Sequence, residues 1–293
     1  MTVAPYCLGW QKSLPDFRDY SLESPEVRAM LERLTPAPPS ADEVPEAESL
    51  VSYFPEVDDQ RQINSSPAQA CVDLVQYFDR RALGRTVKLS KLFVYQATQR
   101  LLGTLGDSGT DLRSTLKAIT SFGIPYEQHW PYDLEKVNDE PAAFLYAFAD
   151  RFRPIRYVRL DGRNRTGQET LAIVKALLNA GLPSVFGFSV PTSISRDGDI
   201  PYRPTFDTIQ GGQAVVAVGY DDQRLSSTKG ALQIRNSWGR DWGDEGYGWL
   251  PYAYVEEQLA ADFWTVISDE WLDSDEFSRP RLPVLAHDDD ESR

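Results

Sequence analysis

Three polar residues that lie far apart in the chain carry groups from which a catalytic site could be built. Ser66 supplies a hydroxyl six residues after Gln60, Gln213 supplies an amide directly before an Ala-Val run, and Asn236 begins the run Asn-Ser-Trp-Gly. A serine that attacks a carbonyl must give up its proton to a base during the attack. An amide donates and accepts hydrogen bonds but does not titrate near neutral pH. A Ser66–Gln213 pair therefore lacks a base.

The segments around these residues resemble the three active-site segments of the papain-like cysteine peptidases, of the bacterial type. The matching runs are 59–68, 211–222 and 234–248, the last with its Asn-Ser-Trp-Gly, Trp-Gly and Gly-Tyr-Gly motifs. In the family a nucleophilic Cys lies six residues after an oxyanion Gln, and a His precedes the Ala-Val strand. The resemblance therefore places Ser66 and Gln213 at the Cys and His positions, and it implies that Gln60 and Asn236 are retained.

These two replacements remove what the chemistry of the family depends on, which is a thiolate already partly formed beside an imidazolium. We therefore expect a pseudoenzyme, a degenerate member that is not an active enzyme. Peptide recognition in the family is mostly recognition of the backbone and needs neither Cys nor His. The expected function is to bind a peptide, a protein terminus or a partner protein in a cleft between two lobes, with a small molecule as a further class of ligand.

Two other functions stay open at this point. The first is an enzyme with altered, non-proteolytic chemistry, such as acyl transfer or cyclisation in a biosynthetic pathway, because a fold does not fix a function. The second is a weak hydrolase that uses Ser66 with an unrecognised base.

The resemblance also assigns residues to the walls of the cleft. Ser108 and Gly109 fall where a strand pairs with the bound peptide. Trp130 and Pro131 fall where the main side-chain pocket is lined, and Trp238 falls where a ring shields the catalytic hydrogen bond from water.

Arg61 stands where the family usually has Gly after the oxyanion Gln. As a large cation at the edge of the cleft, it would narrow the site or bind a carboxylate of a ligand. A solvated loop arginine is the alternative interpretation.

The central residues have structural interpretations as well. Ser66 is a favoured N-cap, and Pro67 would then take the first helical position. Gln213 would keep the site polar by hydrogen bonding to Asn236 or Ser66.

The remaining nucleophiles and bases are few. His129 is interpreted as a surface or cleft-rim residue, with a displaced catalytic base as the alternative. Cys7 and Cys71 are interpreted as small buried apolar side chains.

Composition excludes several classes of partner. The 293 residues carry a formal net charge of −14, with a sequence pI near 4.6. This charge argues against binding to nucleic acid or to anionic membrane surfaces. The chain has two cysteines, no signal peptide and no apolar stretch that approaches 18 residues. We expect a cytoplasmic protein of bacterial type, with no cofactor and no metal.

Periodicity and turn residues predict a helical lobe followed by a β-rich lobe. The resemblance implies an α+β papain-like fold, with a helical left lobe and a β-barrel-like right lobe on either side of a cleft. Helices are predicted at 25–33, 66–85, 90–102, 111–122 and 166–180, and strands at 155–160, 184–190, 213–220, 230–236, 246–251 and 262–267.

The chain is expected to divide into four parts within one papain-like unit. They are an N-terminal arm and linker (1–56), the helical lobe (57–150), the β-rich lobe (151–272) and an acidic tail (273–293). The arm should pack Trp10 and Phe17 against the body of the protein. The tail is expected to be disordered, because it is acidic and contains few apolar residues.

Overall fold

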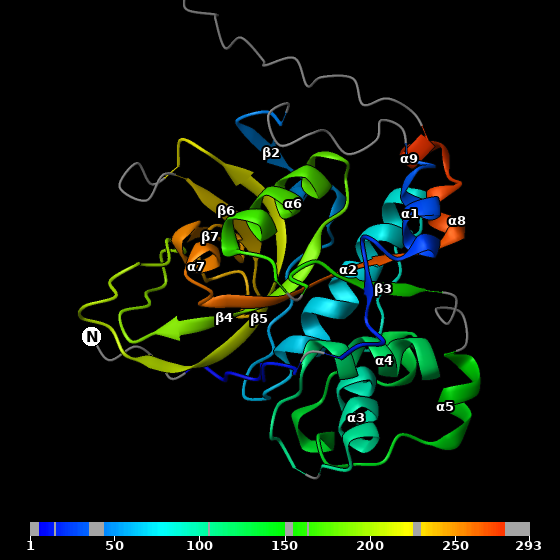
Figure 1. Ribbon diagram of the computed structural model, residues 1–293. Helices are drawn as coiled ribbons and strands as arrows, with labels where there is room; N and C mark the ends of the chain where they lie inside the picture. Colours follow the sequence, from blue (N-terminus) through cyan, green and yellow to red (C-terminus); the bar gives the residue numbers. More distant parts are fainter. Residues whose placement is uncertain are drawn as a thin grey trace, which may run out of the picture.

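The computed structural model describes residues 6–14, 16–34, 44–104, 106–149, 155–162, 164–224 and 230–278. Most of the helices lie on one side of the molecule and most of the strands on the other, with the long helix α2 (Ser66–Leu83) between them (Figure 1). This arrangement confirms the predicted α+β fold with a helical and a β-rich lobe. The boundaries predicted at residues 56, 150 and 272 stay predictions.

The helices of the first lobe begin and end at residues that favour those positions. The hydroxyl of Ser90 accepts from the backbone N–H of Phe93, and the carboxylate of Asp111 accepts from the N–H of Ser114. Glycines with left-handed backbone angles directly follow α2 and the helix that begins after Ser90. The further elements of this lobe are α3 (Lys91–Leu102), α4 (Leu112–Phe122), α5 (Ala143–Phe148) and the 3-10 turns η3 (Glu127–His129) and η4 (Leu134–Lys136).

The second lobe is a mixed sheet with the strand order β1-β3-β8-β4-β5-β6-β7, and β2 pairs with the end of β5. The predicted barrel-like closure is wrong, because no pairing among the described residues joins β1 to β7. The strands are β1 (Tyr20–Ser21), β2 (Ala47–Ser49), β3 (Arg156–Arg159), β4 (Ser184–Pro191), β5 (Ile209–Asp221), β6 (Ala231–Arg235), β7 (Tyr247–Pro251) and β8 (Ala260–Ile267). The helices α6 (Gly167–Asn179) and α7 (Ala253–Glu256) pack beside this sheet.

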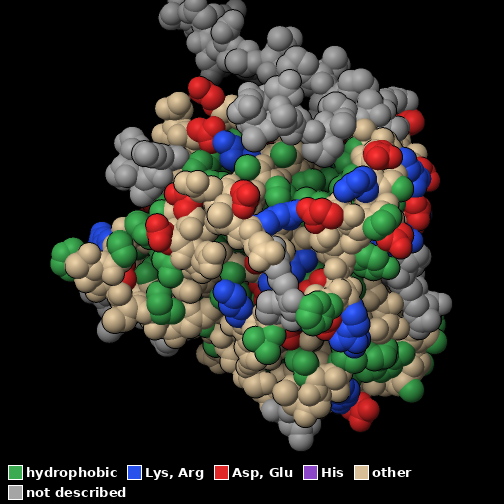
Figure 2. Space-filling view, viewed as in Figure 1, with side chains coloured by type: hydrophobic (Ala, Val, Ile, Leu, Met, Phe, Trp, Pro, Cys, Tyr) green, Lys and Arg blue, Asp and Glu red, His purple; other side chains and the backbone are tan. Residues whose placement is uncertain are grey.

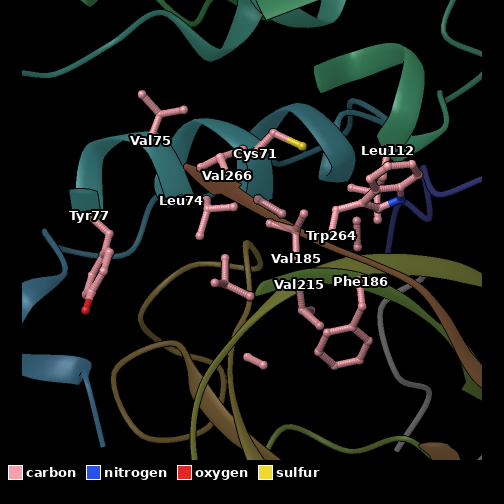
Figure 3. Packing of buried hydrophobic residues seen from close by; sticks show 14 of the residues in the cluster. Cys71, Leu74, Val75, Tyr77, Leu112, Val185, Phe186, Val215, Trp264 and Val266 are labelled. Atoms are coloured by element: carbon pink, nitrogen blue, oxygen red, sulfur yellow. The ribbon is translucent and has the colours of Figure 1, made fainter. Parts of the chain in front are cut away.

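The hydrophobic core lies where α2 crosses the sheet. Cys71 and Leu74 of α2 face Val185 of β4, Val215 of β5 and Val266 of β8, and all five side chains are buried (Figure 3). The helix is buried almost all round, which fits its place between the two lobes. Within the described part of the chain, no helix is long and apolar enough to cross a membrane.

Both ends of the described chain pack on the body of the protein. In the N-terminal part, α1 (Pro25–Leu31) buries Val27 and Met30. At the other end come α8 (Asp269–Leu272) and α9 (Asp275–Ser278), where the buried ring of Phe277 lies 5.8 Å from that of Phe78. The predicted disorder of the tail therefore does not hold for 275–278. Residues 279–293 lie outside the described residues.

A buried ionic network joins α2 to the sheet. The Nε of Arg235 on β6 lies 2.7 Å from the carboxylate of Asp73 on α2, and their side chains are 0% and 4% exposed. Lys91 of α3 lies 2.5 Å from the same carboxylate and 2.7 Å from that of Asp58. The network connects both lobes through groups that have little access to water, so each charge depends on its partners.

We expect Asp73→Asn to lower the free energy of unfolding by about 3–5 kcal/mol, because it leaves two buried cations with one carboxylate fewer. Urea unfolding followed by circular dichroism measures this change. Arg240→Gln is the matched control, since it breaks the exposed Arg240–Glu245 pair and should cost less than about 1 kcal/mol. A loss no larger than that of the control would contradict the prediction.

Asp58 should give the protein a stability that depends on pH. Burial raises the pKa of this carboxyl, but the charges of Lys91 and Lys88 outweigh burial and hold the pKa well below its usual value. Its contribution to stability is therefore complete above the unfolded pKa of about 3.9 and declines as the pH falls towards the folded pKa. The difference in unfolding free energy between the native chain and Asp58→Asn should be constant from pH 7 to 5 and smaller at pH 3. A difference that stays constant down to pH 3 would show that Asp58 is not coupled to folding.

Candidate functional site at the junction of the lobes

The centre of the site is a buried cluster of neutral amides and hydroxyls. Gln213 Nε2 lies 2.9 Å from Gln60 Oε1, 2.9 Å from Asn236 Oδ1 and 3.2 Å from Ser237 Oγ. Ser237 Oγ in turn donates to Gln60 Oε1 over 2.6 Å. The structure thus brings together three residues that the sequence singled out, and it adds Ser237. The run Asn-Ser-Trp-Gly already contained this serine.

Ser66 lies at the edge of this cluster, as the first residue of α2. The N-cap of the helix is Ser65 and not Ser66, so the predicted N-cap role of Ser66 is wrong. The register differs because either serine of the Ser65-Ser66-Pro67 run can precede a helix that has Pro in its first turn. Ser66 is fully buried, and its Oγ accepts from the N–H of Ala214 over 3.2 Å. Gln213 bonds to Asn236, as one interpretation predicted, and no bond from Gln213 to Ser66 is found.

Gln60 is held by the neighbouring segments on both sides. Its backbone N–H donates to the carbonyl of Ser237 over 2.8 Å. The hydroxyl of Tyr132 donates to the Gln60 carbonyl over 3.0 Å and also lies 2.6 Å from Ser65 Oγ. Sequence reasoning did not assign Tyr132 to the site, although it lies directly after the Trp130-Pro131 pair.

Arg61 occupies a backbone conformation that favours glycine. Its φ angle is +51°, and its N–H donates to the carboxylate of Asp59 over 2.7 Å. Because a left-handed φ is costly for a residue with a Cβ, the usual glycine at this position has a physical reason. The residue is exposed, as expected for a solvated loop arginine.

The N-terminal arm lies between the two walls of the junction. We use the name "arm segment" for residues 6–11. On the helical side, Thr110 N–H donates to the Gly9 carbonyl and Gln11 N–H donates to the Thr110 carbonyl, over 2.9 and 3.0 Å. On the side of the sheet, Trp10 N–H donates to the Gly212 carbonyl over 3.0 Å. The arm segment therefore makes backbone hydrogen bonds to both lobes, with Trp10 in an isolated β-bridge to Thr110.

The arm segment also contacts the centre of the site. Gln60 Nε2 donates to the carbonyl of Cys7 over 3.1 Å, and the ring of Tyr6 stacks on Trp238 at 4.0 Å between centroids. Trp238 is thereby covered and is 8% exposed. The side-chain amide of the proposed oxyanion residue is thus used by a backbone carbonyl of the protein itself.

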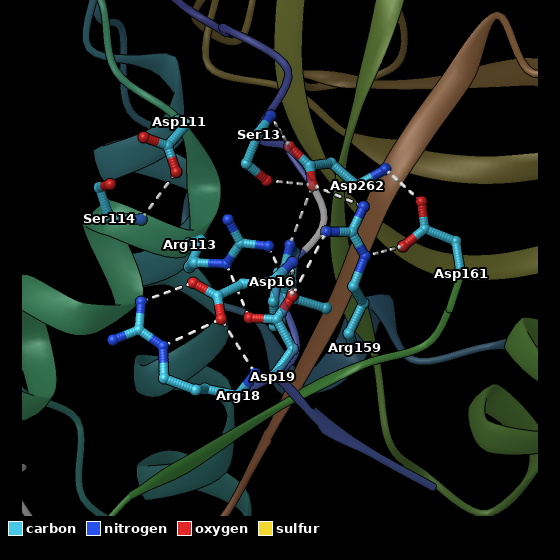
Figure 4. A network of polar contacts seen from close by, with 11 residues as sticks. Ser13, Asp16, Arg18, Asp19, Asp111, Arg113, Ser114, Arg159, Asp161 and Asp262 are labelled. Atoms are coloured by element: carbon cyan, nitrogen blue, oxygen red, sulfur yellow. Dashed lines mark hydrogen bonds and ion pairs between the residues drawn. The ribbon is translucent and has the colours of Figure 1, made fainter. Parts of the chain in front are cut away.

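A charged network anchors the arm beyond this segment (Figure 4). The N–H and the hydroxyl of Ser13 donate to the two carboxylate oxygens of Asp262, over 2.8 and 2.5 Å. Arg159 lies 3.2 Å from Asp262 and 3.0 Å from Asp161. Further along the arm, Asp19 pairs with Arg113 of α4 at 2.5 Å. The hydrogen bonds of Ser13 attach the arm to the β-rich lobe, and the ion pair of Asp19 attaches it to the helical lobe.

The other predicted cleft residues fall into two groups. Ser108 and Gly109 lie against the arm segment, since Gln11 Nε2 donates to the Ser108 carbonyl over 2.6 Å and a Cβ on Gly109 would collide with Gly9. Trp130 points elsewhere, because its indole N–H donates to Gln96 Oε1 on α3 over 2.8 Å. Pro131 is exposed.

The arm aromatics differ from the prediction in one respect. Trp10 packs against the sheet as expected, but Phe17 is 88% exposed, so the expected burial of its ring does not occur. Residues 17–18 form a turn, in which Arg18 pairs with the neighbouring Asp16.

The remaining titratable candidates lie away from Ser66 or are shielded. His129 is exposed, with its ring 5.7 Å from that of Phe148, so it is a surface residue. Cys71 is fully buried, and burial raises the pKa of its thiol well above the usual value. The thiol of Cys7 is partly buried, and burial together with the charge of Asp107 raises its pKa. Among the described residues, no cluster of three His, Cys, Asp or Glu side chains could hold a metal ion.

On the face shown in Figure 2, acidic and basic side chains are interspersed with apolar ones. The contacts of the arm segment itself are made by backbone amides, by aromatic rings and by neutral side chains.

Comparison with known proteins connects this geometry to a family. The pattern of the family described as "Papain family cysteine protease" matches residues 42–260. An uncharacterised peptidase C1-like protein of Acanthamoeba polyphaga mimivirus is 30% identical over 88% of this chain and 86% of its own. A cathepsin B-like protein of Giardia intestinalis, CP2, is 28% identical over 76% of this chain and 75% of its own.

A solved structure supports the same connection. Xylellain, a cysteine protease from Xylella fastidiosa, is 29% identical, with a TM-score of 0.71 over 91% of this chain and 99% of its own. Bromelain from Ananas comosus, at 18% identity and a TM-score of 0.57 over 77% of this chain, shares the fold.

These comparisons correct one prediction. We expected the chain not to be an enzyme, on the basis of Ser66 and Gln213. The matched family and xylellain are cysteine proteases, so this expectation is wrong on the comparisons. That expectation was based on the absence of a familiar base beside Ser66. This absence bears on the mechanism of a reaction, but it does not bear on membership of the family.

Gly9→Ala should displace the arm segment without altering either wall. A Cβ at this position would come closer than 3.0 Å to the carbonyl of Asn64, so the arm must move. Release of the arm should return the pKa of the Cys7 thiol towards its ordinary value and expose the sulfur to the reagent, so alkylation by iodoacetamide at pH 8 should become markedly faster.

Gly162→Ala is the matched control, because no atom lies within 4 Å of a Cβ at that position. It should leave the alkylation of Cys7 unchanged, and peptide mapping distinguishes Cys7 from the buried Cys71. Equal alkylation rates in the native chain and in Gly9→Ala would mean that the arm does not shield Cys7.

Proposed function

Because the chain belongs to the papain family of cysteine proteases, we propose that it binds an extended peptide segment at the junction of its lobes. The observation that carries this proposal is the pairing of the arm segment with both walls. Thr110 on the helical side and Gly212 on the sheet bond to the backbone of the arm. Backbone hydrogen bonds of this kind do not depend on the side chains of the bound segment. A segment of another protein can therefore form them in place of the arm.

The centre of the site suits a peptide carbonyl. The Gln60 amide already donates to the carbonyl of Cys7, and Trp238 offers a flat face to the residue before it. A bound peptide would use the same amide and the same ring. On this proposal the site serves to bind a peptide segment of another protein, and the arm of the same chain occupies that site in this structure.

The arm is an imperfect occupant, which favours its exchange. The Tyr6 hydroxyl and the indole N–H groups of Trp10 and Trp238 are buried without a hydrogen-bond partner among the described residues. Each buried and unpaired polar group costs about 1–3 kcal/mol. The covalent connection offsets this cost, because a tethered segment acts at an effective concentration in the millimolar range.

Chemistry at Ser66 is a second candidate, favoured by the position of its hydroxyl. Ser66 begins a helix of 18 residues, whose N-terminus stabilises negative charge. The bond from Ala214 uses a lone pair of Oγ and leaves its proton available. Gln213 cannot accept that proton, so peptide cleavage or acyl transfer at Ser66 would need a base from the ligand or the solvent.

Peptide binding is tested with a fluorescein-labelled peptide of residues 6–12 and the full chain. We expect Gly9→Ala to bind the peptide at least about tenfold more tightly than the native chain, since the competing segment is displaced. Fluorescence anisotropy measures the dissociation constant, and Gly162→Ala should behave like the native chain. If Gly9→Ala shows fast alkylation of Cys7 and still binds no peptide, the junction is not a peptide site.

Mass spectrometry of the same mixtures tests the second candidate. Cleavage or acyl transfer that occurs with Gly9→Ala and is lost in Gly9→Ala/Ser66→Ala would assign the chemistry to Ser66. An intact peptide with both variants would reject reaction at Ser66 for this peptide.

A further inference from the structure

Two glycines in neighbouring strands form a flat slot for the indole of Trp10. A Cβ on Gly187 of β4 or on Gly212 of β5 would come closer than 3.0 Å to atoms of this ring. Real Cβ atoms do not approach other atoms so closely, so the ring fits because both side chains are absent. Glycine inside a strand weakens the strand, and it often marks the close approach of another group.

The pairing of the strands explains why the two glycines act together. In the β4–β5 pair, Gly187 lies opposite Ala214 and Ser189 lies opposite Gly212. Residues opposite each other, and residues two apart on one strand, share a face of the sheet. The four residues therefore form one face of very small side chains. The indole lies on it.

The space around Gly9, the residue before Trp10, is restricted as strongly. A Cβ on Gly9 would collide with the carbonyl of Asn64, and a Cβ on Gly109 would collide with the carbonyl of Gly9. The bond from Thr110 N–H to the Gly9 carbonyl and the bond from Trp10 N–H to Gly212 fix both residues in register. The walls thus accept a residue without a side chain and, directly after it, a wide flat ring.

We propose that the junction selects peptides that contain glycine followed by tryptophan, with the Gly187–Gly212 slot as the determinant of specificity. This inference rests on the proposed function and names the class of peptide that the site takes. The slot recognises the shape of the ring, because the indole N–H of Trp10 is buried without a described partner. A ring of similar width that has no N–H should therefore bind at least as well as tryptophan.

The test uses the full chain with Gly9→Ala and four labelled peptides of residues 6–12. They are the native peptide and peptides with alanine at the tryptophan, with 2-naphthylalanine at the tryptophan, and with alanine at the glycine. We expect each alanine peptide to bind at least about tenfold more weakly than the native peptide, and the naphthylalanine peptide to bind no more weakly. Equal binding of all four peptides would overturn the slot while leaving peptide binding in place.

A second pair of variants tests the slot from the side of the protein. In Gly9→Ala/Gly187→Ala and Gly9→Ala/Gly212→Ala, the added methyl group fills the slot. The native peptide should then bind as weakly as the peptide with alanine at the tryptophan, while that alanine peptide keeps its affinity and shows that the site is folded. A preference for tryptophan that survives both substitutions would overturn the inference. If none of the peptides binds to Gly9→Ala, the proposed function fails, and the slot inference fails with it.

Discussion

The arrangement of the junction depends on the buried ion pair between Arg235 and Asp73. Arg235 is the last residue of β6 and directly precedes Asn236, and Asp73 lies two turns beyond Ser66 on α2. The pair therefore holds the end of the strand before Asn236 against the helix that begins at Ser66. The guanidinium also donates to the carbonyls at 55 and 56, just before the segment that carries Gln60. A buried charge is tolerated where its donors are matched. Here that matching aligns three segments from distant parts of the chain.

Close approach of backbones is the second constraint on the junction. The arm segment lies flat against both walls because glycines stand at 9, 109, 187 and 212, where a Cβ would collide with the facing residue. Glycine costs conformational entropy, and the cost is offset here by the backbone hydrogen bonds and the aromatic contacts that close packing permits. Close packing at these glycines thus explains both why the arm segment fits the junction and why we infer a specificity for the bound peptide.

The polar side chains at the centre of the candidate site are all uncharged. Gln213, Gln60, Asn236 and Ser237 share hydrogen bonds without a formal charge, so the geometry of the cluster does not depend on a protonation state near neutral pH. Gln213 Oε1 and Asn236 Nδ2 have no hydrogen-bond partner among the described residues.

The sequence by itself determined most of the longer helices and strands and three members of the central cluster, Gln60, Gln213 and Asn236. Ser90, Asp111 and Gly123 mark helix ends through their own backbone and side-chain preferences, and the motifs around Gln213 and Asn236 placed these residues together before any contact was known. Tertiary structure decided the open sheet, the N-cap at Ser65 and the position of the arm. Strand closure and helix register depend on which long-range pairs form, and two adjacent serines carry the same local signal. The slot for Trp10 depends on missing side chains in strands far away along the chain, and a glycine inside a strand does not indicate which residue will lie on it.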